Sequence, residues 1–92
     1  MTWQVELTRK VNRQIAGLPE HVSARLFVLL KEIESTGPVR GNWPNYGKLA
    51  DRVHHCHIKK GHPTYVAVWE ELEHGIRIVE VKYVGTHEKA PY

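Results

Sequence analysis

Three histidines and the only cysteine of the chain occupy consecutive positions, as His54, His55, Cys56 and His57. Imidazole gives and takes protons near neutral pH, and it also binds metal ions. If this segment is a β-strand, alternate side chains lie on opposite faces, so His55 and His57 share one face with Lys59. His54 and Cys56 then face the other way, and we expect that face to be buried. A buried cysteine behaves as a small hydrophobic residue rather than as a nucleophile.

The pair formed by His55 and His57 suits two kinds of chemistry. Zinc accepts neutral imidazoles, but two ligands do not complete a zinc site, and no third ligand follows at a diagnostic spacing. Metal-free cleavage of RNA needs one group that takes the 2′-hydroxyl proton, another that protonates the leaving 5′-oxygen, and cations near the phosphate. Histidines beside lysines fit this second chemistry better, and we expect neither a metal nor another cofactor. A structural, hydrogen-bonding role for each histidine is the alternative.

Positive charge is concentrated in the same part of the chain. The whole chain has a net charge of +3, whereas residues 38–62 alone hold five lysines and arginines and one aspartate. Four of the seven histidines also lie there. A ligand that bears phosphates would be attracted by this field, which strengthens as pH falls through the histidine range. Lysine and arginine are also common on solvated sheet edges, so charge alone does not separate a phosphate site from ordinary surface.

The C-terminal segment, residues 85–92, holds a histidine, a lysine and an aromatic residue, namely His87, Lys89 and Tyr92. The last residues of a chain commonly fray. An aromatic side chain at this place can stack on a base, as in the binding of single-stranded nucleic acid, or it can pack on a neighbouring apolar patch. Composition favours neither role over the other.

The elements that must position these residues begin with a strand and two helices. Residues 3–7 alternate between apolar and polar, which is typical of a half-buried strand. Thr8 suits the N-cap of a first helix, and Pro19 suits the first residue of a second. Both helices carry apolar residues at helical spacing. Glycine and proline within residues 36–38 end the second helix.

Three further strands are expected, at residues 49–59, 64–71 and 76–84. Hairpin turns at residues 61–63 and 73–75 separate them, so the pairing is antiparallel. The expected fold class is therefore α+β, with a short N-terminal strand, two helices and a three-stranded antiparallel meander, and with the helices packed on one face of the sheet. The other face is then free to carry a site.

Composition and length exclude several classes of protein. With 92 residues, of which 41% are hydrophobic and 25% charged, the chain suits one globular domain rather than a disordered or fibrous protein. No apolar run approaches the roughly 18 residues that a membrane span needs, and the N-terminus lacks the pattern of a signal peptide. We therefore expect a cytoplasmic protein with no membrane partner. A single cysteine forms no intramolecular disulfide, so packing alone must hold the domain.

This order of elements, with several short motifs, resembles the RelE/ParE toxin superfamily. The motifs are Ser35-Thr36-Gly37-Pro38 at the end of the second helix, Cys56-His57-Ile58, Tyr65-Val66-Ala67-Val68-Trp69, and Val84-Gly85-Thr86-His87 followed by a near-terminal aromatic residue. The resemblance extends over residues 1–92. The Cys-His-Ile motif and the Gly-Thr-His motif with its aromatic residue are most similar to the YafQ-type branch of messenger-RNA interferases.

The resemblance implies a RelE-like fold and a toxin of a type II toxin-antitoxin system. Such a toxin enters the ribosomal A site and cuts the messenger RNA by 2′-hydroxyl attack, without a metal. A cognate antitoxin protein would neutralise it in a hetero-oligomer. The resemblance also implies that His57 and His87 are the acid-base residues. Tyr92 would occupy the place of the C-terminal aromatic residue, one position further along because Pro91 intervenes.

Two departures from the interferase pattern concern residues near the phosphate. Tyr83 stands where an arginine is common, and Gly61 stands where an acidic residue follows the strand histidine. The cation that stabilises the phosphate must then be one of Lys59, Lys60, Lys89 and Arg77. Lys59 is favoured because it shares a face with His57, although lysine is a point charge and not a bidentate fork. We expect His55 and Tyr83 to complete the RNA-binding surface.

Two other functions stay open. A ParE-like toxin that targets gyrase needs a binding surface but no acid-base pair. A catalytically degenerate, antitoxin-binding module would explain Tyr83 and Gly61 as marks of lost catalysis. For the antitoxin, the three tryptophans, Trp3, Trp43 and Trp69, either line a partly exposed apolar groove or belong to the core.

Overall fold

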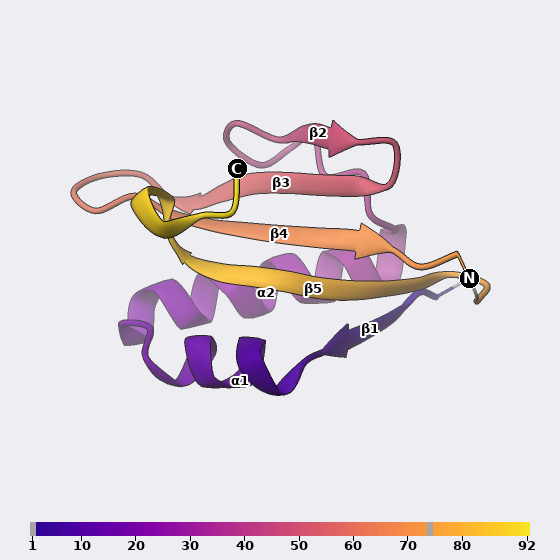
Figure 1. Ribbon diagram of the computed structural model, residues 1–92, viewed down its shortest axis with the longest axis horizontal. Coiled ribbons are helices and arrows are strands. Elements are labelled where there is room, and N and C mark those ends of the chain that lie inside the picture. The colour runs from indigo at the N-terminus through magenta and orange to yellow at the C-terminus, as the bar shows by residue number, and fades with distance from the viewer. Residues whose placement is uncertain (1, 74) are drawn as a thin grey trace.

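Five strands form one mixed sheet in the computed structural model, which describes residues 2–73 and 75–92 (Figure 1). The strands are β1 (Gln4–Leu7), β2 (Gly47–Ala50), β3 (Val53–Lys59), β4 (Tyr65–Glu71) and β5 (Ile78–Thr86). They lie in the order β1-β5-β4-β3-β2. β1 is parallel to β5, and every other neighbouring pair is antiparallel. The chain thus starts at one edge, passes to the other edge at β2, and returns strand by strand.

Two helices, α1 (Arg9–Ala16) and α2 (Glu20–Thr36), cover one face of this sheet (Figure 1). α1 begins after Thr8, whose hydroxyl oxygen accepts a hydrogen bond from the Val11 N–H at 3.1 Å. α2 ends before Gly37, which has a φ of 110° that only glycine adopts without strain. Both boundaries were predicted from residue type. Within the described residues, neither helix combines the length and apolar character that a membrane crossing requires.

The main core lies between the helices and the sheet. The helices contribute fully buried residues at helical spacing, namely Val11, Val22, Leu26, Leu29 and Ile33. The strands contribute alternate residues, among them Cys56, Ile58, Ala67, Trp69, Val79, Val81 and Val84. A smaller cluster of Val66, Val68 and Tyr83 lies on the opposite face. Neither α1 nor α2 covers that face, as expected.

The α+β class and the order of the elements are confirmed, but the expected number of strands was wrong. Residues 49–59 do not form one strand, because the chain turns at Asp51 and Arg52 and residues 47–50 pair back onto β3. The antiparallel part of the sheet therefore has four strands instead of three. β5 extends to Thr86, and a short 3₁₀ helix, η1 (His87–Lys89), follows it in place of a loose tail. His74 of the expected turn at 73–75 lies outside the described residues.

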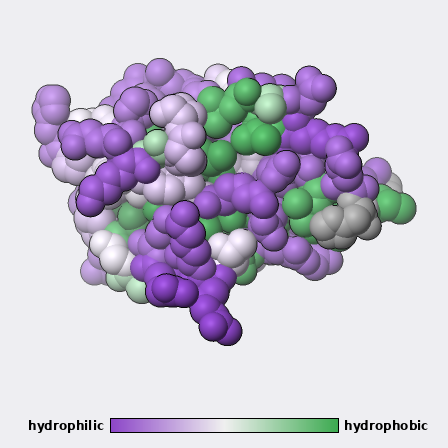
Figure 2. Space-filling model, in the orientation of Figure 1, coloured by the Kyte–Doolittle hydropathy of each residue, from purple (hydrophilic) through white to green (hydrophobic). Residues whose placement is uncertain are grey.

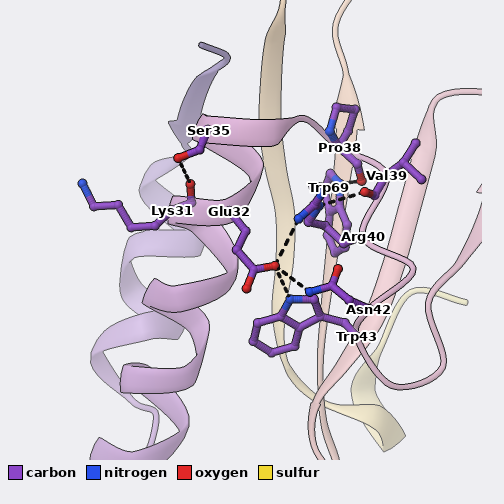
Figure 3. Close-up of polar contacts among 9 residues, drawn as sticks. All are labelled: Lys31, Glu32, Ser35, Pro38, Val39, Arg40, Asn42, Trp43 and Trp69. Atoms are coloured by element: carbon purple, nitrogen blue, oxygen red, sulfur yellow. Dashed lines mark hydrogen bonds and ion pairs between the residues drawn. The ribbon is translucent and has the colours of Figure 1, made fainter. Parts of the chain in front are cut away.

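The loop between α2 and β2 is held by one carboxylate. Glu32 Oε1 accepts hydrogen bonds from Arg40 Nη1 at 3.1 Å, Asn42 Nδ2 at 2.9 Å and Trp43 Nε1 at 2.9 Å (Figure 3). Nearby, Trp69 Nε1 donates to the Pro38 carbonyl oxygen at 3.0 Å. The loop thus closes one end of the core. Trp69 belongs to the core, whereas Trp3 and Trp43 are half-buried and pack against it.

Candidate active site

The structure brings His57 of β3 and His87 of η1 together on the sheet face that neither α1 nor α2 covers. Their ring centroids lie 5.6 Å apart, with the ring planes at 74°. His57 is half-buried and His87 is exposed. This face is the one turned to the viewer in Figure 1, and Figure 2 shows it covered mostly by hydrophilic residues, with hydrophobic residues in separate patches. Two imidazoles from distant parts of the chain therefore share one polar surface.

Main-chain hydrogen bonds hold both histidines in place. The His57 N–H donates to the Pro44 carbonyl oxygen at 2.8 Å, from the loop that Glu32 holds. The His87 N–H donates to the Thr64 carbonyl oxygen at 2.8 Å, which ties the start of η1 to the loop between β3 and β4. The two rings are thus carried by fixed backbone segments, as acid-base catalysis requires.

A hollow of about 260 Å³ opens between the two histidines and the loop that joins β3 to β4. Its lining residues are His57, Gly61, His62, Pro63, Thr64, His87 and Glu88. Two hydrogen bonds close the loop: the Thr64 hydroxyl donates to the Gly61 carbonyl oxygen at 2.9 Å and accepts from the Gly61 N–H at 3.2 Å. The hollow is large enough for a phosphate group, and both imidazoles line it.

Tyr92 and His55 extend the ring cluster along β3. The Tyr92 ring centroid lies 4.9 Å from that of His55 and 5.8 Å from that of His87. The C-terminus folds back over β3, as Figure 1 shows, so Tyr92 does not fray away from the sheet. Because 44% of Tyr92 is exposed, part of its surface stays available to a ligand. This aromatic surface suits the stacking of a base.

Burial sets the protonation of the two strand histidines. It lowers the pKa of His57 below the ordinary value of 6.5, and the nearby charges of His87, Lys60 and His55 lower this pKa further. The pKa of His55 is lowered by burial and then by His87. The Nδ1 atoms of both rings are buried and have no hydrogen-bond partner among the described residues. The lowered pKa favours the neutral form of both imidazoles, and a neutral imidazole can act as a base.

Of the residues that the structure describes, none of the four predicted cations lines the hollow itself, and they differ in how near to it they lie. Lys59 Nζ lies 3.5 Å from the Lys60 carbonyl oxygen, beside the loop that lines the hollow. Lys60 is close enough to lower the pKa of His57. Lys89 follows His87 in η1. Arg77, in contrast, precedes β5 at the end of the sheet away from His87, and lines a different hollow with Arg52 and Glu71. The structure does not bring Arg77 to the histidines.

The two departures from the interferase pattern each have a structural counterpart. Gly61 has a φ of 140°, a backbone conformation in which an acidic side chain would be strained. Tyr83 is buried, and its hydroxyl donates to the Thr86 carbonyl oxygen at 2.7 Å. A Cβ atom on Gly85 would lie 2.6 Å from the Tyr83 hydroxyl oxygen, so glycine is required beneath the phenol. Tyr83 thus braces the strand end that carries His87, and it does not face the hollow.

Cys56 and His54 face the core, as the strand alternation predicts. Both are fully buried, and burial raises the pKa of Cys56 to about 12. Such a thiol stays protonated at neutral pH and is a poor nucleophile. His54 is held through both ring nitrogens: Nδ1 lies 2.6 Å from the Tyr46 hydroxyl and Nε2 lies 2.7 Å from Glu71 Oε2. In the described part of the chain, no group of three or more His, Cys, Asp or Glu side chains is arranged to hold a metal ion.

Sequence reasoning did not place His62, Thr64 or Glu88 in the site. They enter it because the loop after β3 and the turn after β5 meet at one end of the sheet, where Tyr65 pairs with Thr86. The turn signal at residues 61–63 and its nearness to His57 could have suggested His62. No local signal marks Thr64 or Glu88.

Comparisons with known proteins bear on the fold. The sequence matches no model of a protein family, and no curated protein matches it. Among solved structures, the fold is similar to that of a mutant of the E. coli toxin RelE in the free state. That comparison has a TM-score of 0.73 and 16% sequence identity, and it covers 96% of this chain and 86% of the other. A second similar structure is an archaeal RelE-RelB complex from Pyrococcus horikoshii OT3, with a TM-score of 0.66 and 12% identity over 98% of this chain and 100% of the other.

At these identities the likeness concerns the fold. The expected RelE-like architecture is confirmed, with two helices on one face of a mixed sheet. The closer similarity to the YafQ-type branch stays a prediction.

Proposed function

We propose that this protein is the toxin of a type II toxin-antitoxin pair and acts as a ribosome-dependent endoribonuclease on messenger RNA. The observation that carries the proposal is the pairing of His57 and His87, which lie together beside one hollow on a RelE-like fold. Fold alone does not decide function, so the histidine pair carries the argument.

The surroundings of the two histidines suggest their roles. His57, neutral at pH 7 because of its lowered pKa, takes the proton from the 2′-hydroxyl. The 2′-oxygen then forms a bond to phosphorus as the bond to the 5′-oxygen breaks, and His87 protonates that leaving oxygen. The products are a 2′,3′-cyclic phosphate and a free 5′-hydroxyl. Lys59 and Lys60 stabilise the charge that builds on the phosphate oxygens.

The aromatic cluster beside the hollow suits the binding of a base next to the cut. Tyr92 offers its exposed ring surface and His55 supports that ring from below. Stacking of this kind holds unpaired bases without a duplex. A messenger RNA in the ribosomal A site offers such unpaired bases.

An antitoxin protein is the expected partner, in a toxin-antitoxin hetero-oligomer. One of the structures with a similar fold is a complex described as RelE-RelB. Co-expression with the protein encoded beside this chain, followed by co-purification, would test the partnership directly.

The deciding experiment is brief induction of the wild-type protein in a bacterial host, with messenger 5′-ends mapped within minutes. His87→Ala and His57→Ala are the test variants, and His21→Ala, which changes an exposed histidine on α2, is the matched control. We expect cuts inside translated frames for wild type and control, at least about 100-fold fewer for either test variant, and none when translation is blocked.

A catalytically degenerate, antitoxin-binding module is the second candidate function. Gly61 and Tyr83 favour it, because glycine has no group that moves a proton, as an acidic residue has, and the phenol of Tyr83 cannot neutralise a phosphate as an arginine would. Wild-type protein that binds an antitoxin but causes neither cuts nor growth arrest would establish this function. Growth arrest with intact messengers would instead indicate a toxin that acts by binding, as gyrase-targeting toxins do.

A further inference from the structure

A second, larger groove adjoins the hollow between the histidines. It has a volume of about 740 Å³ and runs between α1 and the last residues of β5. Pro63 and Glu88 line both the hollow and this groove, so the two join there. Its size lies within the range of about 300–1,000 Å³ that is typical of ligand sites. An extended ligand that occupies the hollow can therefore continue into the groove.

Three cations surround the groove. Lys10 and Arg13 project from α1, and Lys89 projects from η1. Lys10 and Arg13 are three residues apart, so they lie on the same side of the helix. Within residues 2–73 and 75–92, none of the three forms an ion pair. Glu88 is the only acidic residue among the described lining residues, so the groove has a net positive charge.

Helix α1, which carries Lys10 and Arg13, is fixed to the sheet. β1 pairs with β5 only as far as Val81, and α1 takes its place beside the remainder of β5. There the Gln14 side-chain oxygen accepts a hydrogen bond from the Val84 N–H at 3.0 Å. Gly17 and Gly85 add no side chains to the lining, which leaves the groove open. The positive charges therefore stand at set positions relative to His87.

We propose that this groove binds the sugar-phosphate backbone of the substrate RNA on one side of the cut, with Lys10, Arg13 and Lys89 contacting its phosphates. The inference rests on the proposed function and adds the path of the strand to it. An RNA whose reacting phosphate lies in the hollow beside His57 and His87 must leave it, and the groove is an adjoining exit with positive charge. Contacts of this kind are independent of sequence and strongly dependent on salt.

The test compares two double variants of the full chain that lose the same charge. Lys10→Gln/Arg13→Gln neutralises the groove, and Arg9→Gln/Lys31→Gln neutralises exposed cations outside it. Each protein is titrated into a fluorescent 12-nucleotide 2′-O-methyl RNA, which has no free 2′-hydroxyl to attack, at several salt concentrations. We expect the groove variant to bind at least about 10-fold more weakly, with a salt slope smaller by about 0.7 for each lost contact. The control keeps the wild-type affinity and slope.

Equal affinity and equal salt slope for the two double variants would overturn the inference, as would no RNA binding by the wild-type chain. Loss of binding to ribosomes with unchanged binding to the RNA would also overturn it, in favour of ribosomal RNA as the occupant. Failure of the proposed function is a separate result. If the groove binds the oligonucleotide but the protein never cuts messengers, the proposed binding site is supported and the proposed nuclease activity is refuted.

Discussion

The two candidate catalytic histidines meet in one site, but their surroundings differ. His57 lies half-buried in a strand, and its enclosed Nδ1 atom has no hydrogen-bond partner in the part of the chain that the structure describes. His87 lies at an exposed turn, at the rim of the hollow. A base that must be neutral and an acid that must be supplied with protons from solvent need these two kinds of environment. These two environments fit the opposite roles that we propose for chemically identical side chains.

The surroundings of His57 lead to a prediction about its titration. Burial and the charges of His87, Lys60 and His55 lower its pKa, so its NMR titration should have a midpoint below 6.5 in the free protein. Lys60→Gln removes one of these charges and should move the midpoint upward, whereas Lys48→Gln should not. Inorganic phosphate bound in the hollow should also raise it. A midpoint at or above 6.5 in the free wild-type protein would contradict this account.

Tyr83 and Gly85 should behave as a coupled pair. A methyl group on Gly85 meets the Tyr83 hydroxyl, which cannot move without breaking its hydrogen bond to the Thr86 carbonyl. We expect Gly85→Ala to lower the free energy of unfolding by about 1–3 kcal/mol. The cost should be smaller in a Tyr83→Leu background, as measured by urea unfolding in a double-mutant cycle. Gly41→Ala is the control, because a Cβ atom there meets no other atom within 4 Å. Equal losses of unfolding free energy in both backgrounds would show that the cost of Gly85→Ala does not come from the contact with Tyr83.

At the scale of elements, the loop between α2 and β2 links the helical layer to the candidate active site. Glu32 holds this loop through Arg40, Asn42 and Trp43 (Figure 3). Further along the loop, the Pro44 carbonyl oxygen accepts a hydrogen bond from the His57 N–H. The Tyr46 hydroxyl adds a contact to the buried His54. A change in α2 can therefore reach β3 through this loop, although no residue of α2 lines the hollow.

Glu32→Ala should reveal how much this loop depends on one carboxylate. It leaves the donors of Arg40, Asn42 and Trp43 without their acceptor, and we expect a loss of about 1–3 kcal/mol in the free energy of unfolding. Glu34→Ala, on the exposed side of the same helix, should cost less than about 1 kcal/mol. The comparison is made by urea unfolding. A loss no larger for Glu32→Ala than for Glu34→Ala would show that the loop is held by its apolar contacts instead.

At the scale of the whole molecule, stability should fall in acid in two steps. The pKa values of His55 and His57 are lowered by folding, so below 6.5 the unfolded chain binds more protons than the folded one. The free energy of unfolding should then decrease as pH falls from 6.5 toward the folded values, by at most about 1.4 kcal/mol per pH unit for each histidine. The carboxyl of Glu32, whose pKa is lowered mainly by hydrogen bonds from Asn42 and Trp43, adds a second decrease below 4.5.

Urea unfolding at a series of pH values separates these steps. His55→Asn/His57→Asn should remove the decrease that begins near 6.5 and keep the one below 4.5, whatever its effect on overall stability. If the decrease near pH 6.5 persists in that variant, titratable groups other than His55 and His57 cause it.

Much of the arrangement was determined by the sequence alone, because it depends on neighbours in the chain. The two-residue repeat of a strand predicted that His54 and Cys56 face the core while His55 and His57 face outward, and the burial of these residues confirms it. Thr8 and Gly37 marked helix ends because capping is a property of a few adjacent residues. The positively charged residues 38–62 and the Gly-Thr-His motif predicted the region of the candidate site.

Only the tertiary structure decided which of these residues meet. The register that pairs Tyr65 with Thr86 and His57 with Val66 brings the ends of β3 and β5 together, and thereby His57 and His87. The same pairing sends Arg77 to the other end of the sheet and lets Lys10 and Arg13 face Lys89 across a groove. These relations join residues far apart in the chain. They follow from the packing of whole elements, which no local pattern of residues encodes.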